Sequence, residues 1–119
     1  MKKLKVDFDI WYIGEIMASV IYSTVGDIED ARRIAHTLVD EKLVACVNIV
    51  PRIESVYRWE GKKEEDEECI FIAKTRDENV DKTINRIRTL HPYELPDIIV
   101  IPIKGGLNEY LEYISNETS

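Results

Sequence analysis

Two short segments constrain the fold of this chain more than any other feature, because each carries apolar side chains at successive positions. One is LVACVNIV over residues 43–50, interrupted only by Asn48, and the other is DIIVIPI over residues 97–103. Segments of this length and composition are typical of β-strands that are buried on both faces of a sheet. The sequence therefore predicts a sheet in which residues 43–50 form a central strand and both faces are covered.

Two further strands and two helices complete the predicted domain. Strands are predicted over residues 19–24 (SVIYST) and 69–75 (CIFIAKT), which are rich in β-branched and aromatic residues. Apolar residues recur at helical spacing over residues 27–42 and 77–90, and each of these segments begins with an aspartate that could cap the first turn. Each helix should therefore pack one face on the sheet.

A long hairpin is predicted in the middle of the chain. Pro51 cannot donate to a strand ladder, so it predicts a bulge or kink, after which alternation resumes over Ser55–Trp59. The EGKK segment at 60–63 predicts the turn, and the acidic run EEDEE at 64–68 leads into the next strand. We interpret the acidic run as a solvated hairpin tip, because it lacks the ligand spacing of a calcium loop.

The last third of the chain is punctuated by prolines and glycines. Two prolines in His91–Pro96 exclude a helix and predict a stiff connecting loop, and Pro102 predicts an edge position or a strand end. A short helix is predicted over residues 107–114 after Gly105-Gly106. The resulting order β, α, β, β, α, β is that of an α+β ferredoxin-like fold, an antiparallel sheet with both helices on one face and a helical tail.

Two helices cannot cover both faces of such a sheet. The face opposite the helices would expose apolar side chains from the strands at 43–50 and 97–103. Packing that face against further copies of the chain would bury it and would also pair the edges of the hairpin. Oligomerisation is therefore predicted from the residues alone.

Length and charge narrow the class of protein. The chain has 119 residues, enough for one domain, and its net charge of −7 argues against binding to nucleic acid. Cys46 and Cys69 lack the spacing of a zinc site or a disulfide framework, which favours a cytoplasmic location. We expect residues 1–18 to be an N-terminal extension that is neither signal peptide nor membrane span, and residues 19–119 to be the domain.

Four motifs from different parts of this domain occur in the order found in one known family. They are ACVNI at 45–49, SVYRWEG at 55–61, KT at 74–75 and HPYELP at 91–96. Together they make residues 19–114 resemble the CutA, or divalent-cation-tolerance, family. The chain departs from the family pattern at Val25-Gly26, where a proline is frequent, and at Tyr113, where a tryptophan is usual.

The resemblance implies a non-enzymatic homotrimer with a PII-like architecture and a cleft between neighbouring subunits. It implies a role in tolerance of divalent metals, especially copper, with the metal bound at that cleft and no cofactor required. An alternative is a PII-like adaptor that senses a small metabolite and recruits an unidentified protein partner. No hydrolase, metalloprotease or phosphate-loop motif occurs, and no arginine stands where an acylphosphatase, which shares the fold, would need one.

Three residues are candidate metal ligands. His91 offers imidazole nitrogens suited to Cu(II), and Glu94 could add an oxygen from the same loop. Their structural alternative is that they hold the proline-rich loop by hydrogen bonds. Cys46 is a soft ligand, but its apolar neighbours favour packing as a small hydrophobic residue.

Further residues are placed at the subunit boundary. The resemblance puts Glu68, Lys74, Tyr93 and Tyr110, together with Glu94, in the wall of the cleft, where a small anionic or metal ligand could sit. The alternative for this set is an interface hydrogen-bond network. Tyr57 and Trp59 are predicted to anchor the contact between subunits, because aromatic residues are enriched at interfaces.

Overall fold

The computed structural model describes residues 17–119 and is an α+β fold. Its elements are β2 (Ala18–Val25), α1 (Ile28–Asp40), β3 (Cys46–Trp59), β4 (Lys62–Arg76), the 3-10 turn η2 (Asp77–Asn79), α2 (Val80–Leu90), β5 (Ile99–Ile103) and α3 (Asn108–Glu117). The predicted order of strands and helices is confirmed. The prediction for residues 1–16 lies outside the described residues.

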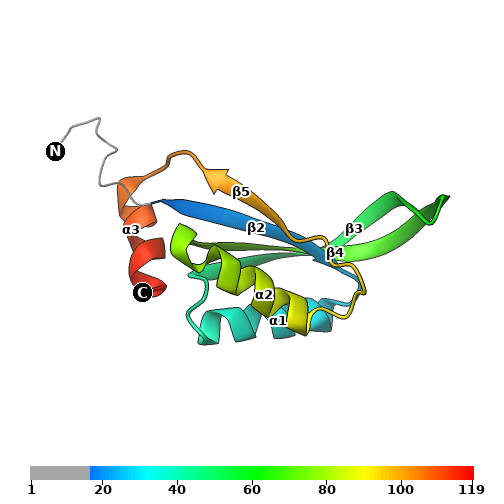
Figure 1. Ribbon diagram of the computed structural model, residues 1–119, viewed down its shortest axis with the longest axis horizontal. Helices are drawn as coiled ribbons and strands as arrows, with labels where there is room; N and C mark the ends of the chain where they lie inside the picture. The colour runs from blue at the N-terminus through cyan, green and yellow to red at the C-terminus, as the bar shows by residue number, and fades with distance from the viewer. Residues whose placement is uncertain (1–16) are drawn as a thin grey trace.

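The four described strands form one antiparallel sheet in the order β3-β4-β2-β5 (Figure 1). β5 lies at one edge, as Pro102 predicted. The expectation of a central strand over residues 43–50 was wrong, because β3 begins only at Cys46 and occupies the opposite edge of the sheet. Val44 and Ala45 are buried just before this strand, so their apolar character reflects the packing of the segment that connects α1 to β3.

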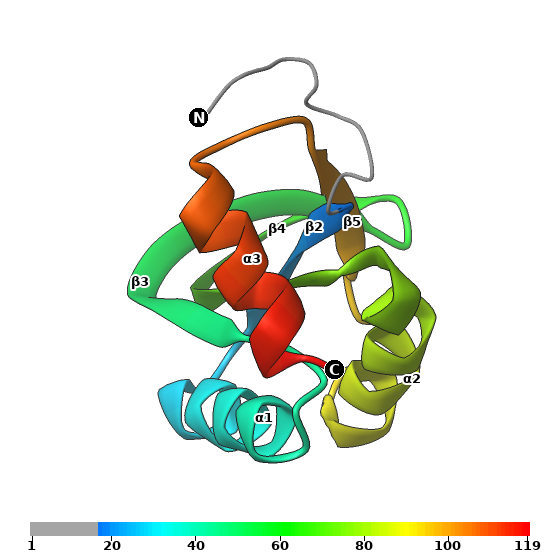
Figure 2. The same ribbon diagram turned by 90° about the vertical axis from the view of Figure 1, so that its left-hand side faces the viewer.

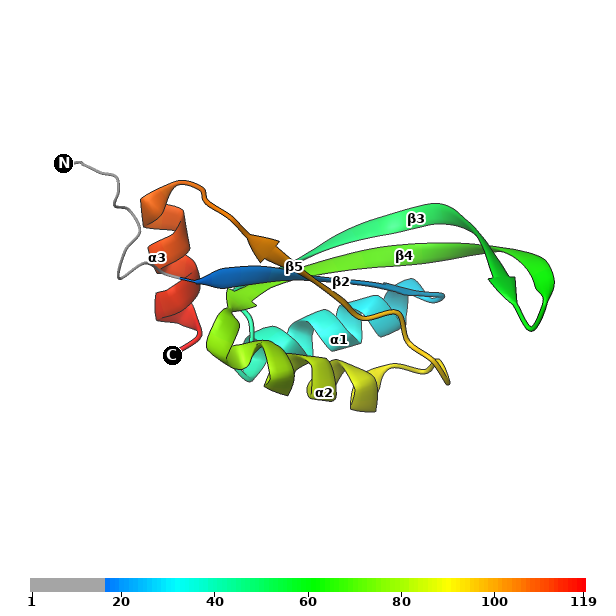
Figure 3. The same ribbon diagram turned by 45° about the horizontal axis from the view of Figure 1, so that its top comes forward.

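α1 and α2 cover one face of the sheet, while α3 crosses its end (Figures 2 and 3). Alternate residues of the inner strands point toward the helices, as the period of two requires. The fully buried side chains of this layer include Ile21 and Val25 of β2, Phe71 of β4, Ile34 and Leu38 of α1 and Ile87 of α2. A smaller cluster of Ala18, Ala45 and Ile114 attaches α3 to the sheet.

The two predicted helix caps have different outcomes. Asp27 caps α1, and its Oδ1 accepts a hydrogen bond of 2.9 Å from the backbone N–H of Glu29. Asp77 does not cap the second helix. Its carboxylate accepts a hydrogen bond of 2.8 Å from the hydroxyl of Ser19, so it ties the start of β2 to the turn before α2.

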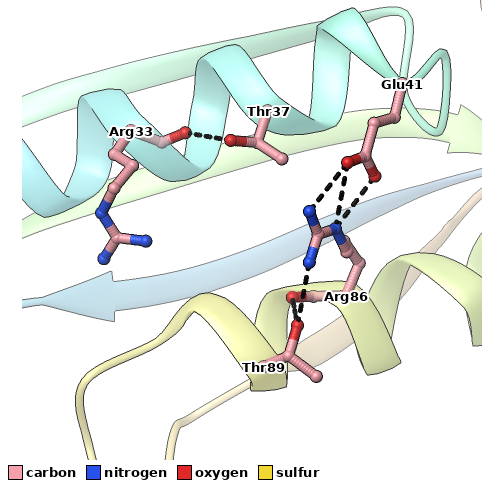
Figure 4. A network of polar contacts seen from close by, with 5 residues as sticks. All are labelled: Arg33, Thr37, Glu41, Arg86 and Thr89. Atoms are coloured by element: carbon pink, nitrogen blue, oxygen red, sulfur yellow. Dashed lines mark hydrogen bonds and ion pairs between the residues drawn. The ribbon is translucent and has the colours of Figure 1, made fainter.

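A network of polar contacts joins α1 to α2 on the side of the helices that faces away from the sheet (Figure 4). The Arg86 guanidinium donates three bonds to Glu41, one of 2.9 Å to Oε1 and two of 3.2 Å and 2.8 Å to Oε2. Arg86 also donates to Thr89 over 3.4 Å, while Arg33 reaches from α1 to the backbone oxygen of Leu90. The Arg86 and Glu41 side chains are 38% and 41% exposed, so solvent screens the pair and its contribution to stability is small.

The β3–β4 hairpin extends beyond the helices as an arm (Figures 1 and 3). Its register shifts between Val50 and Ile53, which confirms the bulge predicted at Pro51. Glu60 and Gly61 form the tip with positive φ angles of 51° and 81°, the conformation that tight hairpin turns require. The acidic run at 64–68 lies within β4 and pairs with β3, so its predicted position at the hairpin tip was wrong, whereas the predicted exposure to solvent is confirmed for Glu65, Asp66 and Glu67.

No described helix covers the second face of the sheet. Ile99 and Ile101 flank Val100, which packs against the core, and they are 50% and 49% exposed. On the hairpin, Val56 is 63% exposed. The helices within residues 17–119 are all too short or too polar to cross a bilayer. In a single copy, the sheet face formed by residues 17–119 therefore leaves apolar surface, including Ile99, Ile101 and Val56, uncovered by the described helices.

Candidate functional site

A cavity of about 670 Å³ opens where the hairpin leaves the body of the domain. β2, the two strands of the hairpin and the loop after α2 contribute its walls. Tyr22 and Thr24 of β2 alternate with the core residues Ile21 and Val25, so the cavity lies toward the face that the helices leave open. The lining residues used below are Glu54, Tyr57 and Trp59 of β3, Glu68 of β4, and Tyr93, Glu94 and Asp97 of the loop.

His91 is the C-cap residue of α2 and anchors the following loop to β2. Its side chain is buried, and its Nε2 lies 2.8 Å from the backbone oxygen of Thr24. Because a carbonyl oxygen can only accept, Nε2 carries the proton, and Nδ1 accepts a bond of 3.2 Å from the backbone N–H of Tyr93. Both ring nitrogens are thus occupied, and a metal ion on either would have to displace one of these bonds.

Tyr93 and Glu68 meet in the cavity wall. The Tyr93 hydroxyl donates to Oε2 of Glu68, a residue that is only 8% exposed. Burial and the bond to this carboxylate both raise the pKa of Tyr93. A Cβ added at Gly26 would lie 3.3 Å from the Tyr93 hydroxyl, so the glycine leaves the room that this ring needs.

Asp97 is a site residue that the sequence interpretation missed. Its two carboxylate oxygens accept bonds from the backbone N–H and the hydroxyl of Thr24, at 3.1 Å and 2.6 Å. These bonds fasten the end of the loop to β2 and hold Asp97 at the cavity. An aspartate directly after Pro96 at the start of a strand was the available signal, but nothing local identified its partner 73 residues away.

The hairpin adds aromatic and acidic groups. Tyr57 donates to Asp66 on the paired strand, and this hydrogen bond raises the pKa of Tyr57 to about 12. Tyr57 and Trp59, the predicted interface anchors, are 40% and 41% exposed and line the cavity. Glu94 also lines the cavity and is exposed.

The remaining predicted residues lie at the other end of the sheet. The Tyr110 hydroxyl is 3.6 Å from Sγ of Cys46 and 3.4 Å from Nζ of Lys74. Lys74 pairs with both Cys46 and Val20, whereas His91 contacts Thr24. The four residue steps from Val20 to Thr24 span about 13 Å of strand. The predicted cleft residues therefore form two groups, with Glu68 and Tyr93 in one and Lys74 and Tyr110 in the other.

The predicted metal ligands do not converge in one copy of the chain. Cys46 belongs to the Tyr110 group, while His91 and Glu94 belong to the cavity loop. Across residues 17–119, no three His, Cys, Asp or Glu side chains are arranged to hold a metal ion. Whether these residues bind metal in an assembly therefore stays a prediction.

Comparison with known proteins identifies the family. The family model described as CutA1 divalent ion tolerance protein matches residues 19–117. The chain belongs to this CutA1 family. Protein CutA 1 from the chloroplast of Oryza sativa subsp. japonica is 48% identical over 99 residues, and the divalent-cation tolerance protein CutA of Thermus thermophilus is 44% identical over 102 residues. The resemblance drawn from the sequence motifs is confirmed.

The relatives differ in length. The alignments cover 83% of this chain but 56% of the rice protein, against 86% of this chain and 99% of the Thermus protein. This chain therefore spans about half the length of the plant relatives. These CutA1 relatives are named for divalent-cation tolerance or simply as CutA, and neither name is that of an enzyme.

Solved structures of CutA1 proteins match the fold. The crystal structure of CutA1 from Oryza sativa superposes with a TM-score of 0.85 at 45% identity and covers 88% of this chain and 96% of its own. The CutA1 structure from Thermus thermophilus gives 0.84 at 44% identity, with 87% and 100% coverage. The α+β fold with an antiparallel sheet is thus shared with the family.

Proposed function

We propose that this chain is the ferredoxin-like subunit of a PII-like homotrimer that contributes to divalent-metal tolerance in the cytoplasm without catalysing a reaction. The observation that carries the proposal is the uncovered sheet face, on which Ile99 and Ile101 are about half exposed. Contiguous exposed apolar surface marks an interaction site in soluble proteins. Membership of the CutA1 family supports the link to metal tolerance.

The edges of the sheet also favour assembly. Among residues 17–119, β3 and β5 are the edge strands, each with one side unpaired by another described strand, and the hairpin carries Tyr57 and Trp59. Such edges and exposed aromatic side chains are typical of surfaces that pair with another chain. Closed symmetric assembly of identical copies would satisfy both features at once.

The assembly is expected to complete a metal site that a single copy lacks. Glu94 is exposed at the cavity, and no hydrogen bond to it exists among residues 17–119. One carboxylate holds a divalent ion weakly, because Cu(II) and similar ions prefer several nitrogen or oxygen ligands. We therefore propose that copper binds between subunits, with Glu94 as one ligand and His91 as a second that gives up its bond to Tyr93.

Sedimentation velocity at micromolar concentration tests the assembly. Three copies of the 13.8 kDa chain are expected to sediment together. Ile101→Glu should release smaller species, because it places a charge on the open sheet face. Val39→Glu is the matched control, since Val39 is 41% exposed on α1 and should leave the trimer intact. A well-folded wild-type monomer at this concentration would refute the trimer.

Calorimetric titration with Cu(II) tests the metal site. Glu94→Gln and His91→Ala should each weaken binding by about tenfold or more, which corresponds to about 1.4 kcal/mol. Glu112→Gln is the control, because Glu112 is an exposed carboxylate on α3. Copper binding that is unchanged in both site variants would show that the ion binds elsewhere on the surface.

The alternative function, a metabolite-sensing adaptor, is favoured by the cavity itself. Its volume of about 670 Å³ lies in the range of small-molecule sites, and its walls combine aromatic residues with a few polar groups. Thermal-shift screening of metabolites tests this function, because a ligand that binds only the folded protein raises its stability. A specific stabilising compound in the absence of metal would support the adaptor.

A further inference from the structure

We infer that the exposed side of α3 is a docking surface for residues 10–13 of the same chain, the IWYI segment that precedes the described residues. The docking surface is a stripe formed by Leu107, Tyr110 and Tyr113. The family model begins at residue 19, so its occupant lies outside the part of the chain that the family shares. The inference goes beyond the proposed function, because it requires neither a metal ion nor a trimer.

The stripe is apolar and lies along one side of α3. Leu107 is 69% exposed, and Tyr110 and Tyr113 are 39% and 40% exposed. A spacing of three residues places them next to one another on a helix, and the two tyrosine rings pack with their centroids 5.4 Å apart. Leu111 and Ile114 belong to the side of α3 that packs on the sheet. The stripe is therefore left uncovered by the residues that hold α3 in place.

The hydroxyl groups of both tyrosines already have partners within the described chain. The Tyr113 hydroxyl donates to the backbone oxygen of Ala45 over 3.3 Å. The Tyr110 hydroxyl lies 3.6 Å from Sγ of Cys46 and 3.4 Å from Nζ of Lys74. The groups that best cover this stripe are therefore apolar and aromatic side chains, which pack on the tyrosine rings and need no hydrogen bond from them.

The chain enters the described fold next to α3. The backbone oxygen of Met17 accepts a bond of 2.9 Å from the N–H of Asp77, and Ala18 packs in one cluster with Ile114 of α3. α3 lies at the end of the sheet opposite the hairpin arm (Figures 1 and 3), away from the cavity and its aromatic walls. The ten residues of α3 span about 15 Å. The six residue steps from Trp11 to Met17 reach at most about 20 Å, enough to place Trp11 on the stripe.

The sequence before Met17 is complementary to this surface in both polarity and charge. The IWYI segment supplies four consecutive apolar or aromatic side chains, and lysines at positions 2, 3 and 5 precede it, separated from it by two aspartates. α3 carries Glu109 and Glu112 beside the stripe and has no basic residue of its own. Neither glutamate forms an ion pair with another residue from 17 to 119. Opposite charges favour contact between the lysines and this acidic side of α3.

The fluorescence of Trp11 in the full chain tests the inference. The chain has two tryptophans, so Trp59→Phe leaves Trp11 as the reporter. A docked Trp11 should emit at shorter wavelength than the synthetic peptide of residues 1–16 and should be protected from quenching by acrylamide. Leu107→Glu should lower the ratio of docked to undocked segment by about tenfold, which corresponds to about 1.4 kcal/mol. Val39→Glu is the matched control, because Val39 is 41% exposed on α1.

Charge exchange tests the contact with the lysines. Combining Glu109→Lys with Glu112→Lys should weaken docking at low ionic strength, and replacing the three lysines by glutamate in this variant should restore the protection of Trp11. Asp40→Lys combined with Asp81→Lys makes the same change of charge on α1 and α2, where both residues are exposed, and should leave Trp11 protected. Far-UV circular dichroism checks that each variant is folded.

Several results would overturn the inference. It fails if acrylamide quenches Trp11 in the full chain as strongly as in the peptide, or if Leu107→Glu leaves the protection unchanged. Protection that depends on protein concentration would assign the contact to a neighbouring copy, and a blue shift that needs vesicles of anionic lipid would assign the segment to a membrane surface. Either result would also refute the inference. A monomer in sedimentation with a protected Trp11 would refute the trimer and support this docking.

Discussion

The attachment of the cavity loop to β2 depends on Asp97, and its removal should destabilise the whole domain. In Asp97→Ala, the backbone N–H and the hydroxyl of Thr24 both lose their acceptor, and Thr24 is only 7% exposed. A buried donor left unpaired costs about 1 to 3 kcal/mol, and a hydrogen bond to a charged group contributes about 1.5 to 3 kcal/mol. Because the hydroxyl can rotate toward water, we expect a net loss of roughly 2 to 4 kcal/mol.

Urea unfolding followed by far-UV circular dichroism measures this loss, at one fixed protein concentration because the stability of an oligomer depends on it. Asp97→Asn is the matched control, since its amide oxygen can still accept from the Thr24 N–H, and it should cost less than Asp97→Ala. Combining Asp97→Ala with Thr24→Val completes a double-mutant cycle, in which the two losses should not add. A loss below about 0.5 kcal/mol for Asp97→Ala, or strict additivity in the cycle, would refute the reasoning.

Three further predictions concern other contacts. Folding raises the pKa of Tyr93, so the neutral tyrosine stabilises the folded state fully below about pH 10, where the unfolded tyrosine ionises. This stabilisation is lost as pH rises toward the pKa of the folded state. Tyr93→Phe should therefore reduce the decline in the free energy of unfolding that urea titrations measure at alkaline pH. Gly26→Ala should push the Tyr93 ring away from Glu68, visible as a changed near-UV circular dichroism spectrum with an unchanged far-UV spectrum. The Arg86 bond lowers the pKa of Glu41, so the stability difference between wild type and Glu41→Gln should disappear as pH falls through the carboxyl range and in high salt.

Local chemistry determined the elements of this protein. Alternating or continuous apolar runs predicted the strands, and helical spacing predicted α1 and α2, because these periods follow from backbone geometry alone. Asp27 predicted the N-cap of α1, Pro51 predicted the bulge in β3, and Pro102 predicted that β5 is an edge strand. In each case a residue and its immediate neighbours carry the whole physical reason.

Tertiary structure alone decided how those elements meet. An apolar run indicates burial but not strand order, so it could not distinguish the central position expected for residues 43–50 from the edge position that β3 occupies. The burial of Glu68 within an acidic run depends on the loop that brings Tyr93 over it. Likewise, the sequence did not show that Asp97 binds Thr24 or that His91 and Cys46 lie at different ends of the sheet. Contacts between residues that are distant in the chain arise only from the packing of the sheet and its loops.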